Sequence, residues 1–221
     1  MVTFATALAE GGASVSGGLG SIMGSKNLKA IAVNGDIRPV SADPDKLEQF
    51  VSYVKQIRLS TFNAPSPWAV PGLTKQEDCY GCGVGCSRQS YIDETGRRYK
   101  NFCQATGVYT MPALQYYGKP NDVPRLATRL CDGFGLDSAV MAPMISWLIE
   151  CYQQGLLSEN QTGLPFSKAG SIEFIESLTH QIAYRQGFGD LLSHVTLYAA
   201  ETIGGRANEI TSKFVAAETN E

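Results

Sequence analysis

The chain has 221 residues, of which 43% are hydrophobic and 18% charged, and its formal net charge is -3. These values predict a water-soluble protein with a core and argue against the basic surface that attracts nucleic acid or anionic membranes. No apolar run is long enough for insertion into a membrane. Six cysteines in a chain without an export signal predict metal chemistry in a reducing compartment, hence a cytoplasmic protein.

A glycine-rich segment at residues 17–26 precedes the first clear apolar run. Glycine permits positive φ and lets backbone N–H groups approach a ligand closely, so a ligand cradle and a plain tight turn are both open. Residues 28–33 then predict a buried strand. Because a strand needs partners, and too few precede it here, we expect the chain to be a fragment of a longer protein.

Helix signals follow along the chain. Asp43 and Pro44 predict the start of a helix whose apolar residues continue to position 57. Residues 60–72 predict a loop, and residues 91–100 a hairpin tip. Residues 101–112 show no clean period. Further helices are predicted at residues 121–131, 138–154, 171–186 and 190–203, and the tail from residue 206 is expected to fray. The sequence therefore predicts a mainly α protein with a small β-containing N-terminal piece.

Three cysteines form a C-x2-C-x3-C run with glycines between them: Cys79, Cys82 and Cys86. This spacing lets three thiolates converge and favours an iron–sulfur cluster, with zinc, a disulfide or an inert role as alternatives. A cubane cluster needs four ligands. The candidates for the fourth are a residue outside this chain, Cys103, Cys131 and Cys151, although Cys151 is more typical of a buried apolar position.

Two carboxylates flank a glycine bend in the segment Asp132-Gly133-Phe134-Gly135-Leu136-Asp137. Capping aspartates at a helix–turn–helix joint are the more common use of this pattern, and Asp137 can cap the following helix. The alternative is that both carboxylates accept hydrogen bonds from the amino groups of a bound heterocycle. His180 and His194 are predicted on helices, where a histidine is usually a surface or satisfied core residue.

Three features in this order resemble the aldehyde ferredoxin oxidoreductase family of tungsten or molybdenum pterin enzymes: residues 17–31, the cysteine run, and Asp132-x-x-Gly135-Leu136-Asp137. The resemblance implies that the three clustered cysteines bind a [4Fe-4S] cluster. It also implies that Asp132, Leu136 and Asp137 contact a tungsten (or molybdenum) bis-pterin, with backbone N–H groups of Gly17 and Gly18 contributing. Residues 1–42 would then end a β-rich cofactor-binding domain, and residues 43–221 would form the helical middle domain.

The resemblance implies oxidation of aldehydes to carboxylic acids, with electrons passing through the cluster to ferredoxin or another electron-transfer protein. The remaining domains would come from the same polypeptide or from a partner subunit. Two positions depart from the family pattern. Gly12 and Ser16 stand where arginines usually face the pterin phosphates, and Gln104 stands near the position of a family acid. Because glutamine cannot act as a general base, the catalytic residue is unknown.

Two alternatives follow from these departures, and a third from the absence of a domain interface and a fourth cluster ligand. Gln104 motivates an aromatic acyl-thioester reductase on the same scaffold. The missing arginines motivate a cluster-binding electron-transfer or structural subunit without pterin. The last alternative is that the isolated chain is inactive.

Overall fold

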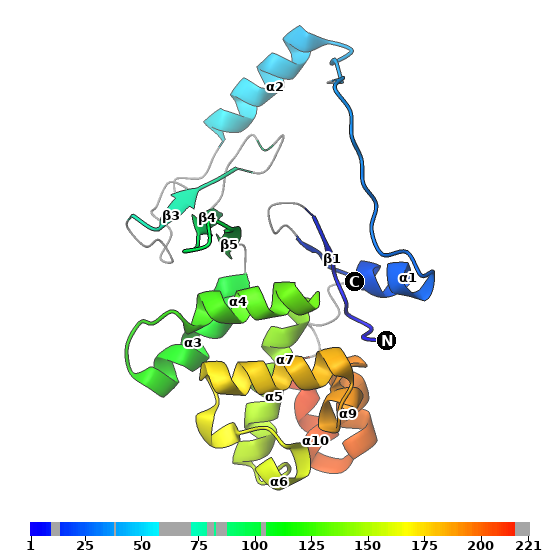
Figure 1. Ribbon diagram of the computed structural model, residues 1–221, viewed down its shortest axis with the longest axis vertical. Coiled ribbons are helices and arrows are strands. Elements are labelled where there is room, and N and C mark those ends of the chain that lie inside the picture. The colour runs from blue at the N-terminus through cyan, green and yellow to red at the C-terminus, as the bar shows by residue number, and fades with distance from the viewer. Residues whose placement is uncertain are drawn as a thin grey trace. The chain divides into compact units, whose positions relative to one another are not determined.

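The computed structural model describes residues 1–9, 14–37, 39–57, 72–78, 82, 88–102 and 105–214. The chain divides into two compact units, one formed by Met1–Leu28 with Gln104–Glu221 and the other by Lys29–Cys103. The first unit is helical apart from a two-residue ladder, and the second carries a helix and a three-stranded sheet (Figure 1). This architecture confirms the mainly α fold with a small β part.

The first unit begins with the antiparallel pair β1 (Ala7–Leu8) and β2 (Ser14–Val15). Its helices and 3-10 turns are α1 (Leu19–Ser25), α3 (Ala105–Tyr117), α4 (Val123–Phe134), α5 (Ser138–Gln153), α6 (Glu159–Thr162), η3 (Phe166–Lys168), α7 (Ile172–Tyr184), α8 (Phe188–Leu192), α9 (Val195–Ile203), α10 (Gly205–Ile210) and η4 (Thr211–Lys213). Helix α3 packs on α4 and α5, α4 packs on α7, and α5 packs on α9 (Figure 1).

Helix α5 supplies much of the core of this unit. Met144, Trp147 and Leu148 on this helix have no exposed surface, as expected for a helix that is apolar on most of its circumference. The Trp147 indole Nε1 donates a hydrogen bond to the backbone oxygen of Ala207, 3.1 Å away. That bond ties α5 to α10, so the tail that we expected to fray is folded as far as η4.

The structure adds a helix that the sequence analysis did not predict and corrects one that it did. Residues 105–117 form α3 despite Pro112 and the absence of a helical period. The helix predicted at residues 190–203 is two helices, because the chain breaks after Leu192 and Val195 has a φ of 69°. Helix α4 buries the side that carries Ala127 and Cys131, and Leu126 is 40% exposed.

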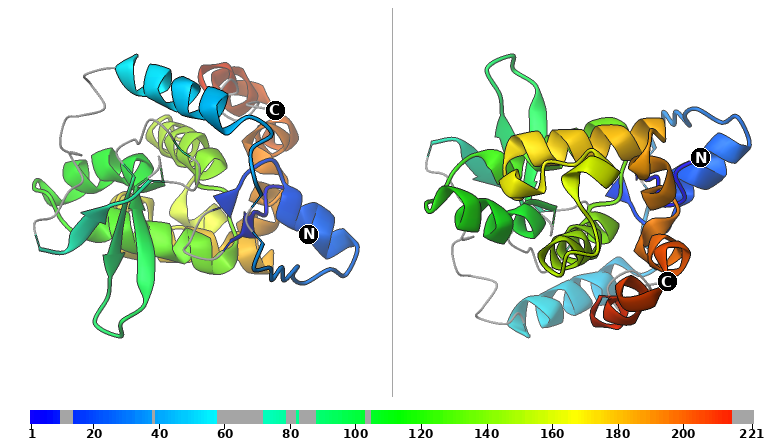
Figure 2. Two further views of the ribbon diagram at one scale, coloured as in Figure 1. Left: turned by 90° about the horizontal axis from the view of Figure 1, so that it is seen from above. Right: turned by 90° about the horizontal axis from the view of Figure 1, so that it is seen from below.

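The second unit contains α2 (Pro44–Gln56) and the antiparallel strands β3 (Thr74–Gln76), β4 (Gln89–Ile92) and β5 (Arg98–Phe102) in that order. Helix α2 begins as predicted, with Oδ1 of Asp43 accepting a hydrogen bond from the Lys46 backbone N–H at 2.9 Å. Strands β4 and β5 form the predicted hairpin, whose turn is closed by the Asp93 N–H bonding to the Arg97 oxygen (Figure 2).

The prediction of a buried strand at residues 28–33 is wrong. No strand is formed there, and Ile31 and Val33 are 70% and 90% exposed. A buried strand requires neighbouring strands that take up its backbone hydrogen bonds, and no described strand pairs with residues 28–33. The loop predicted at residues 60–72 lies almost wholly outside the described residues. Among the helices that the structure describes, none combines the length and apolar character needed to cross a bilayer.

Candidate functional site

The N-terminal segment, residues 1–6, lies against the aspartate turn, residues 132–137. Ala5 forms an isolated antiparallel bridge with Leu136. Next to it, the Thr6 backbone N–H donates to the Gly135 oxygen at 2.7 Å. These backbone contacts join residues that are about 130 positions apart, and they fix the aspartate turn from one side.

The same N-terminal segment holds the glycine-rich segment. The Gly20 N–H donates to the Ala5 oxygen at 2.9 Å. A Cβ at Gly20 would lie 2.3 Å from the Thr6 oxygen, and one at Gly18 would lie 2.7 Å from the Thr3 oxygen. Both distances are too short for any side chain, so glycine is required for this approach. The N-terminal segment thereby brings the glycine-rich segment and the aspartate turn, two of the three predicted motifs, to one place.

The glycine-rich segment is a loop only at its start. Gly17 and Gly18 have φ values of 78° and 70°, a left-handed conformation that favours glycine, and α1 begins at Leu19. The segment follows the short strand β2 and is not followed by a strand, which reverses the predicted order. A Cβ at Gly17 would meet no atom of the described residues within 4 Å.

The aspartate turn joins α4 to α5. Gly135, with a φ of 66°, ends α4, and the Leu136 N–H donates back to the Cys131 oxygen at 2.8 Å. Oδ1 of Asp137 accepts a hydrogen bond from the Ala139 N–H at 2.9 Å. The prediction that Asp137 caps the following helix is therefore confirmed.

The side chains of the turn differ in their environments. Leu136 is 2% exposed and packs in the core, whereas Asp132 is half-buried and Asp137 is 5% exposed. A carboxylate has two oxygens and about four acceptor positions, so Asp137 can cap α5 and still accept a ligand N–H. The Thr6 hydroxyl beside the turn is buried and has no hydrogen-bond partner in the described part of the chain. A buried polar atom of this kind is usually satisfied by a ligand or a water molecule. These residues fit a hydrogen-bonding heterocycle such as a pterin.

The cysteine run belongs to the connection between β3 and β4. Gln76 pairs with Gln89, and the Glu77 N–H donates to the Arg88 oxygen at 3.1 Å. These two pairs bring together the two ends of the connection, residues 78–87, in which the sequence places all three clustered cysteines. Within it Cys82 is described and exposed.

The other predicted cluster cysteines, Cys79, Cys86 and Cys103, lie outside the described residues, and so does Gln104, which stands near the position of a family acid. In the ranges that the structure covers, no group of three His, Cys, Asp or Glu residues could hold a metal ion. The three-thiolate site therefore stays a prediction, supported by the pairing that brings the two ends of this connection together.

Two of the candidates for a fourth ligand are core residues of the first unit. Cys151 has no exposed surface, and burial, aided by the charge of Glu150, raises the pKa of its thiol to about 11. Because a metal ligand must be a thiolate, this environment opposes ligation and agrees with the predicted apolar role. Cys131 is equally buried, with its Sγ 2.7 Å from the Tyr109 hydroxyl.

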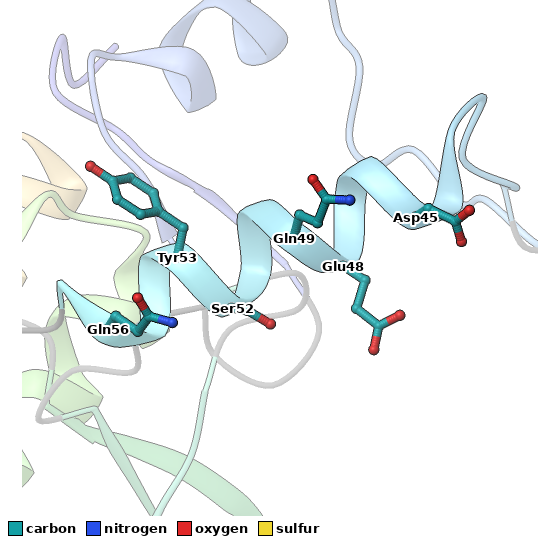
Figure 3. Close-up of a pocket in the computed structure, with 6 residues that line it drawn as sticks. All are labelled: Asp45, Glu48, Gln49, Ser52, Tyr53 and Gln56. Carbon is teal, nitrogen blue, oxygen red and sulfur yellow. The ribbon is translucent and has the colours of Figure 1, made fainter.

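A hollow of about 480 Å³ lies along α2 in the second unit, and Figure 3 shows its lining side chains. The residues that line it are all on this one helix: Asp45, Glu48, Gln49, Ser52, Tyr53 and Gln56. It contains none of the residues predicted to bind a cofactor and brings together no acid–base or metal-binding group from another element. We do not assign it a role.

Sequence reasoning missed the residues that assemble this site. Nothing in the periodicity marks residues 4–6 as a partner of the aspartate turn, because the pairing is between distant positions. Gly20 carried a usable signal, since its spacing from Gly18 is typical of a close backbone approach. Tyr109 carried none, because it lies in a helix without a recognisable period.

Comparisons with known proteins identify the family. The family model described as aldehyde ferredoxin oxidoreductase, domains 2 & 3, matches residues 55–218. The tungsten-containing aldehyde ferredoxin oxidoreductase of Pyrococcus horikoshii is 25% identical over 86% of this chain and 38% of its own length. The enzyme of the same name from Pyrococcus furiosus is 25% identical over 96% of this chain and 42% of its own length.

A solved structure shares the fold. The active-site complex BamBC of benzoyl coenzyme A reductase, bound to 1,5-dienoyl-CoA, matches 90% of this chain and 37% of its own chain, with a TM-score of 0.63 and 22% identity. The chain thus spans about two fifths of the length of the relatives that it matches. Because the family model covers well over half of the residues, the chain belongs to the aldehyde ferredoxin oxidoreductase family.

Proposed function

We propose that this chain is part of a tungsten- or molybdenum-pterin oxidoreductase that oxidises aldehydes to carboxylic acids. The overall reaction takes an oxygen atom from water and releases two electrons and two protons. The observation that carries the proposal is that residues 4–6 form backbone contacts with both the glycine-rich segment and the aspartate turn. We call this meeting point of the three segments the junction. Two motifs that the family uses at its cofactor are side by side here through backbone contacts alone.

The residues at the junction have distinct proposed roles. Asp132 and Asp137 accept hydrogen bonds from the amino groups of a pterin, and Leu136 anchors their turn in the core. Gly17 and Gly18 have the proposed role of offering backbone N–H groups to the cofactor, and their left-handed φ values favour glycine at both positions. When bound, the metal–pterin group supplies the two-electron redox chemistry, and the protein supplies its placement.

The cysteine loop has the proposed role of electron exit. Cys79, Cys82 and Cys86 would hold three corners of a [4Fe-4S] cluster, with a fourth ligand from elsewhere in the protein. Pairing of β3 with β4 keeps the ends of this loop together, which lowers the entropy lost when three thiolates converge. The cluster would pass electrons one at a time to ferredoxin or another electron-transfer protein in the cytoplasm.

A second candidate function is the reduction of an aromatic acyl thioester on the same scaffold. It is favoured by Gln104, which stands near the position of a family acid and cannot accept a proton at neutral pH. An enzyme that needs no general base at this position tolerates glutamine, whereas the oxidation of an aldehyde would need another group to accept the proton of the attacking water. Substrate assays separate the two reactions.

The test uses the whole protein that carries this sequence, purified without oxygen. Iron, tungsten, molybdenum and zinc are measured together with pterin fluorescence after oxidative extraction. Dye-linked turnover is then assayed with aldehydes and with aromatic acyl thioesters. The proposal expects iron, pterin and one of the two heavy metals, with turnover of aldehydes. Turnover of thioesters alone would establish the second candidate. Iron without pterin would contradict both and leave an electron-transfer or structural subunit.

A further inference from the structure

A tyrosine on α3 contacts both ends of the aspartate turn. Tyr109 is 1% exposed, and its hydroxyl lies 2.7 Å from Sγ of Cys131, the residue immediately before the turn. The side chain of Ser138, the residue immediately after the turn, lies close enough to the same hydroxyl to lower its pKa. One buried phenol therefore bridges the last turn of α4 and the first residue of α5.

The environment keeps this phenol in its neutral form. Burial raises the pKa of Tyr109 well above its ordinary value, and the neighbouring Cys131 and the charge of Asp132 raise it further. A neutral phenol has one O–H to donate and lone pairs to accept, so it can satisfy two partners at once. Its hydrogen bonds are consequently present over the whole physiological pH range.

The phenol and the N-terminal segment hold the turn by independent contacts. Ala5 and Thr6 bond to the backbone in the middle of the turn, at Leu136 and Gly135. Tyr109 instead contacts the side chains at its two ends. Neither contact involves the carboxylates that are proposed to face the pterin. Both contacts restrain the turn that carries these carboxylates, and so they affect the position of the carboxylates without binding them.

We propose that Tyr109 is a positioning residue for pterin binding, which fixes the spacing of Asp132 and Asp137 by bridging Cys131 and Ser138. The inference rests on the proposed pterin role of the aspartate turn. Removing the hydroxyl leaves both carboxylates chemically unchanged but lets α4 and α5, and with them the two carboxylates, move relative to each other. The bound pterin should then be released faster, although no atom that touches it has changed.

The experiment measures the release of pterin from the whole protein carrying Tyr109→Phe, which removes only the hydroxyl. Samples are held in denaturant below the unfolding midpoint, and released pterin is read by fluorescence after oxidation. Loss of one buried hydrogen bond corresponds to release that is roughly fivefold to tenfold faster. The matched control is Tyr117→Phe on the same helix, whose side chain is 40% exposed and whose variant should release pterin at the wild-type rate.

A second variant separates positioning from general stability. Ser138→Ala removes one partner of the phenol, and the double variant should release pterin no faster than Tyr109→Phe alone, since both changes break one network. If Tyr109→Phe does not accumulate as folded protein, Ser138→Ala gives the same readout. Wild-type release from Tyr109→Phe with a lowered unfolding midpoint would overturn the inference and leave the proposed function intact. A wild-type protein without pterin would overturn the proposed function itself.

Discussion

Helices α5 and α2 have the same kind of N-terminal cap but differ in how far their side chains are buried. Each has an aspartate cap that accepts a backbone N–H at 2.9 Å, from Asp137 in α5 and Asp43 in α2. Each also carries large apolar side chains. In α5 Trp147 has no exposed surface, whereas Phe50 of α2 is 56% exposed. Local sequence decides that both segments are helical, and distant partners decide which one is buried.

The partners of α5 come from across the first unit. Helices α3 and α9 pack on it, and the N-terminal segment fixes the turn from which it starts. No residue of α2 is buried. The helix with packing partners is the one that starts at the proposed cofactor site, so the site rests on the well-packed part of the described chain.

Truncation of the two aromatic residues should show the largest difference. Trp147→Ala leaves a cavity and an unpaired Ala207 oxygen, and we expect it to lower the free energy of unfolding by about 3–5 kcal/mol. Phe50→Ala should cost less than about 1 kcal/mol, because its side chain is already more than half exposed. Denaturant unfolding of the chain measures both. Equal costs would mean that α2 is covered in solution and would contradict the contrast between a buried α5 and an exposed α2.

Two glycines of α1 test the approach of the N-terminal segment. Gly20→Ala would place a Cβ 2.3 Å from the Thr6 oxygen, so the segment must shift, and we expect a cost of about 1–3 kcal/mol. Gly24→Ala meets only the Met1 sulfur at 3.7 Å and should stabilise the helix by about 0.5–1 kcal/mol. Thermal unfolding compares the two variants. A Gly20→Ala protein as stable as wild type would show that the approach does not occur.

The two capping aspartates should also differ in their effects on stability. Asp137→Ala should lower the free energy of global unfolding by about 1 kcal/mol, because α5 is part of the core. Asp43→Ala removes the same kind of bond but should mainly speed amide hydrogen exchange within α2, with little effect on the global midpoint. Hydrogen exchange read residue by residue separates the two outcomes. An equal loss of the free energy of global unfolding in both variants would contradict the expected difference between α5 and α2.

The smallest expected effect concerns a surface ion pair between α5 and the end of the first unit. Nζ of Lys213 lies 2.9 Å from Oε1 of Glu150, and this hydrogen bond, with one from Gln154, lowers the pKa of Glu150. A carboxyl with a lowered folded-state pKa contributes stability above its unfolded pKa and loses it as the pH falls. Lys213→Met should therefore raise the pKa of Glu150 toward 4.5 and reduce acid sensitivity slightly. An NMR titration that finds no change would exclude the pair.

The parts of the fold that depend on neighbouring residues were predictable from the sequence. The aspartates that cap α2 and α5 and the turn of the β4–β5 hairpin were all predicted and are confirmed. Each depends on a hydrogen bond or a backbone conformation within a few residues. The family was also predictable, since its three motifs are read in order along the chain.

The parts that depend on distant contacts were not predictable. The apolar run at residues 28–33 has the pattern of a buried strand, yet Val33 is 90% exposed because pattern does not supply a partner. The bridge between Ala5 and Leu136 has no signal in either segment. The contact of Tyr109 with Cys131 joins two helices whose facing sides the sequence did not indicate. Tertiary packing decided all three.

The most direct measurement for the central claim is the pterin and tungsten or molybdenum content of the whole protein with Asp137→Asn, compared with wild type. Asparagine caps a helix about as well as aspartate, so the free energy of unfolding should change by only about a few tenths of a kcal/mol. It loses one carboxylate oxygen for the cofactor, so the content of pterin and metal should fall several-fold. Full pterin and metal in a normally folded Asp137→Asn protein would contradict the account.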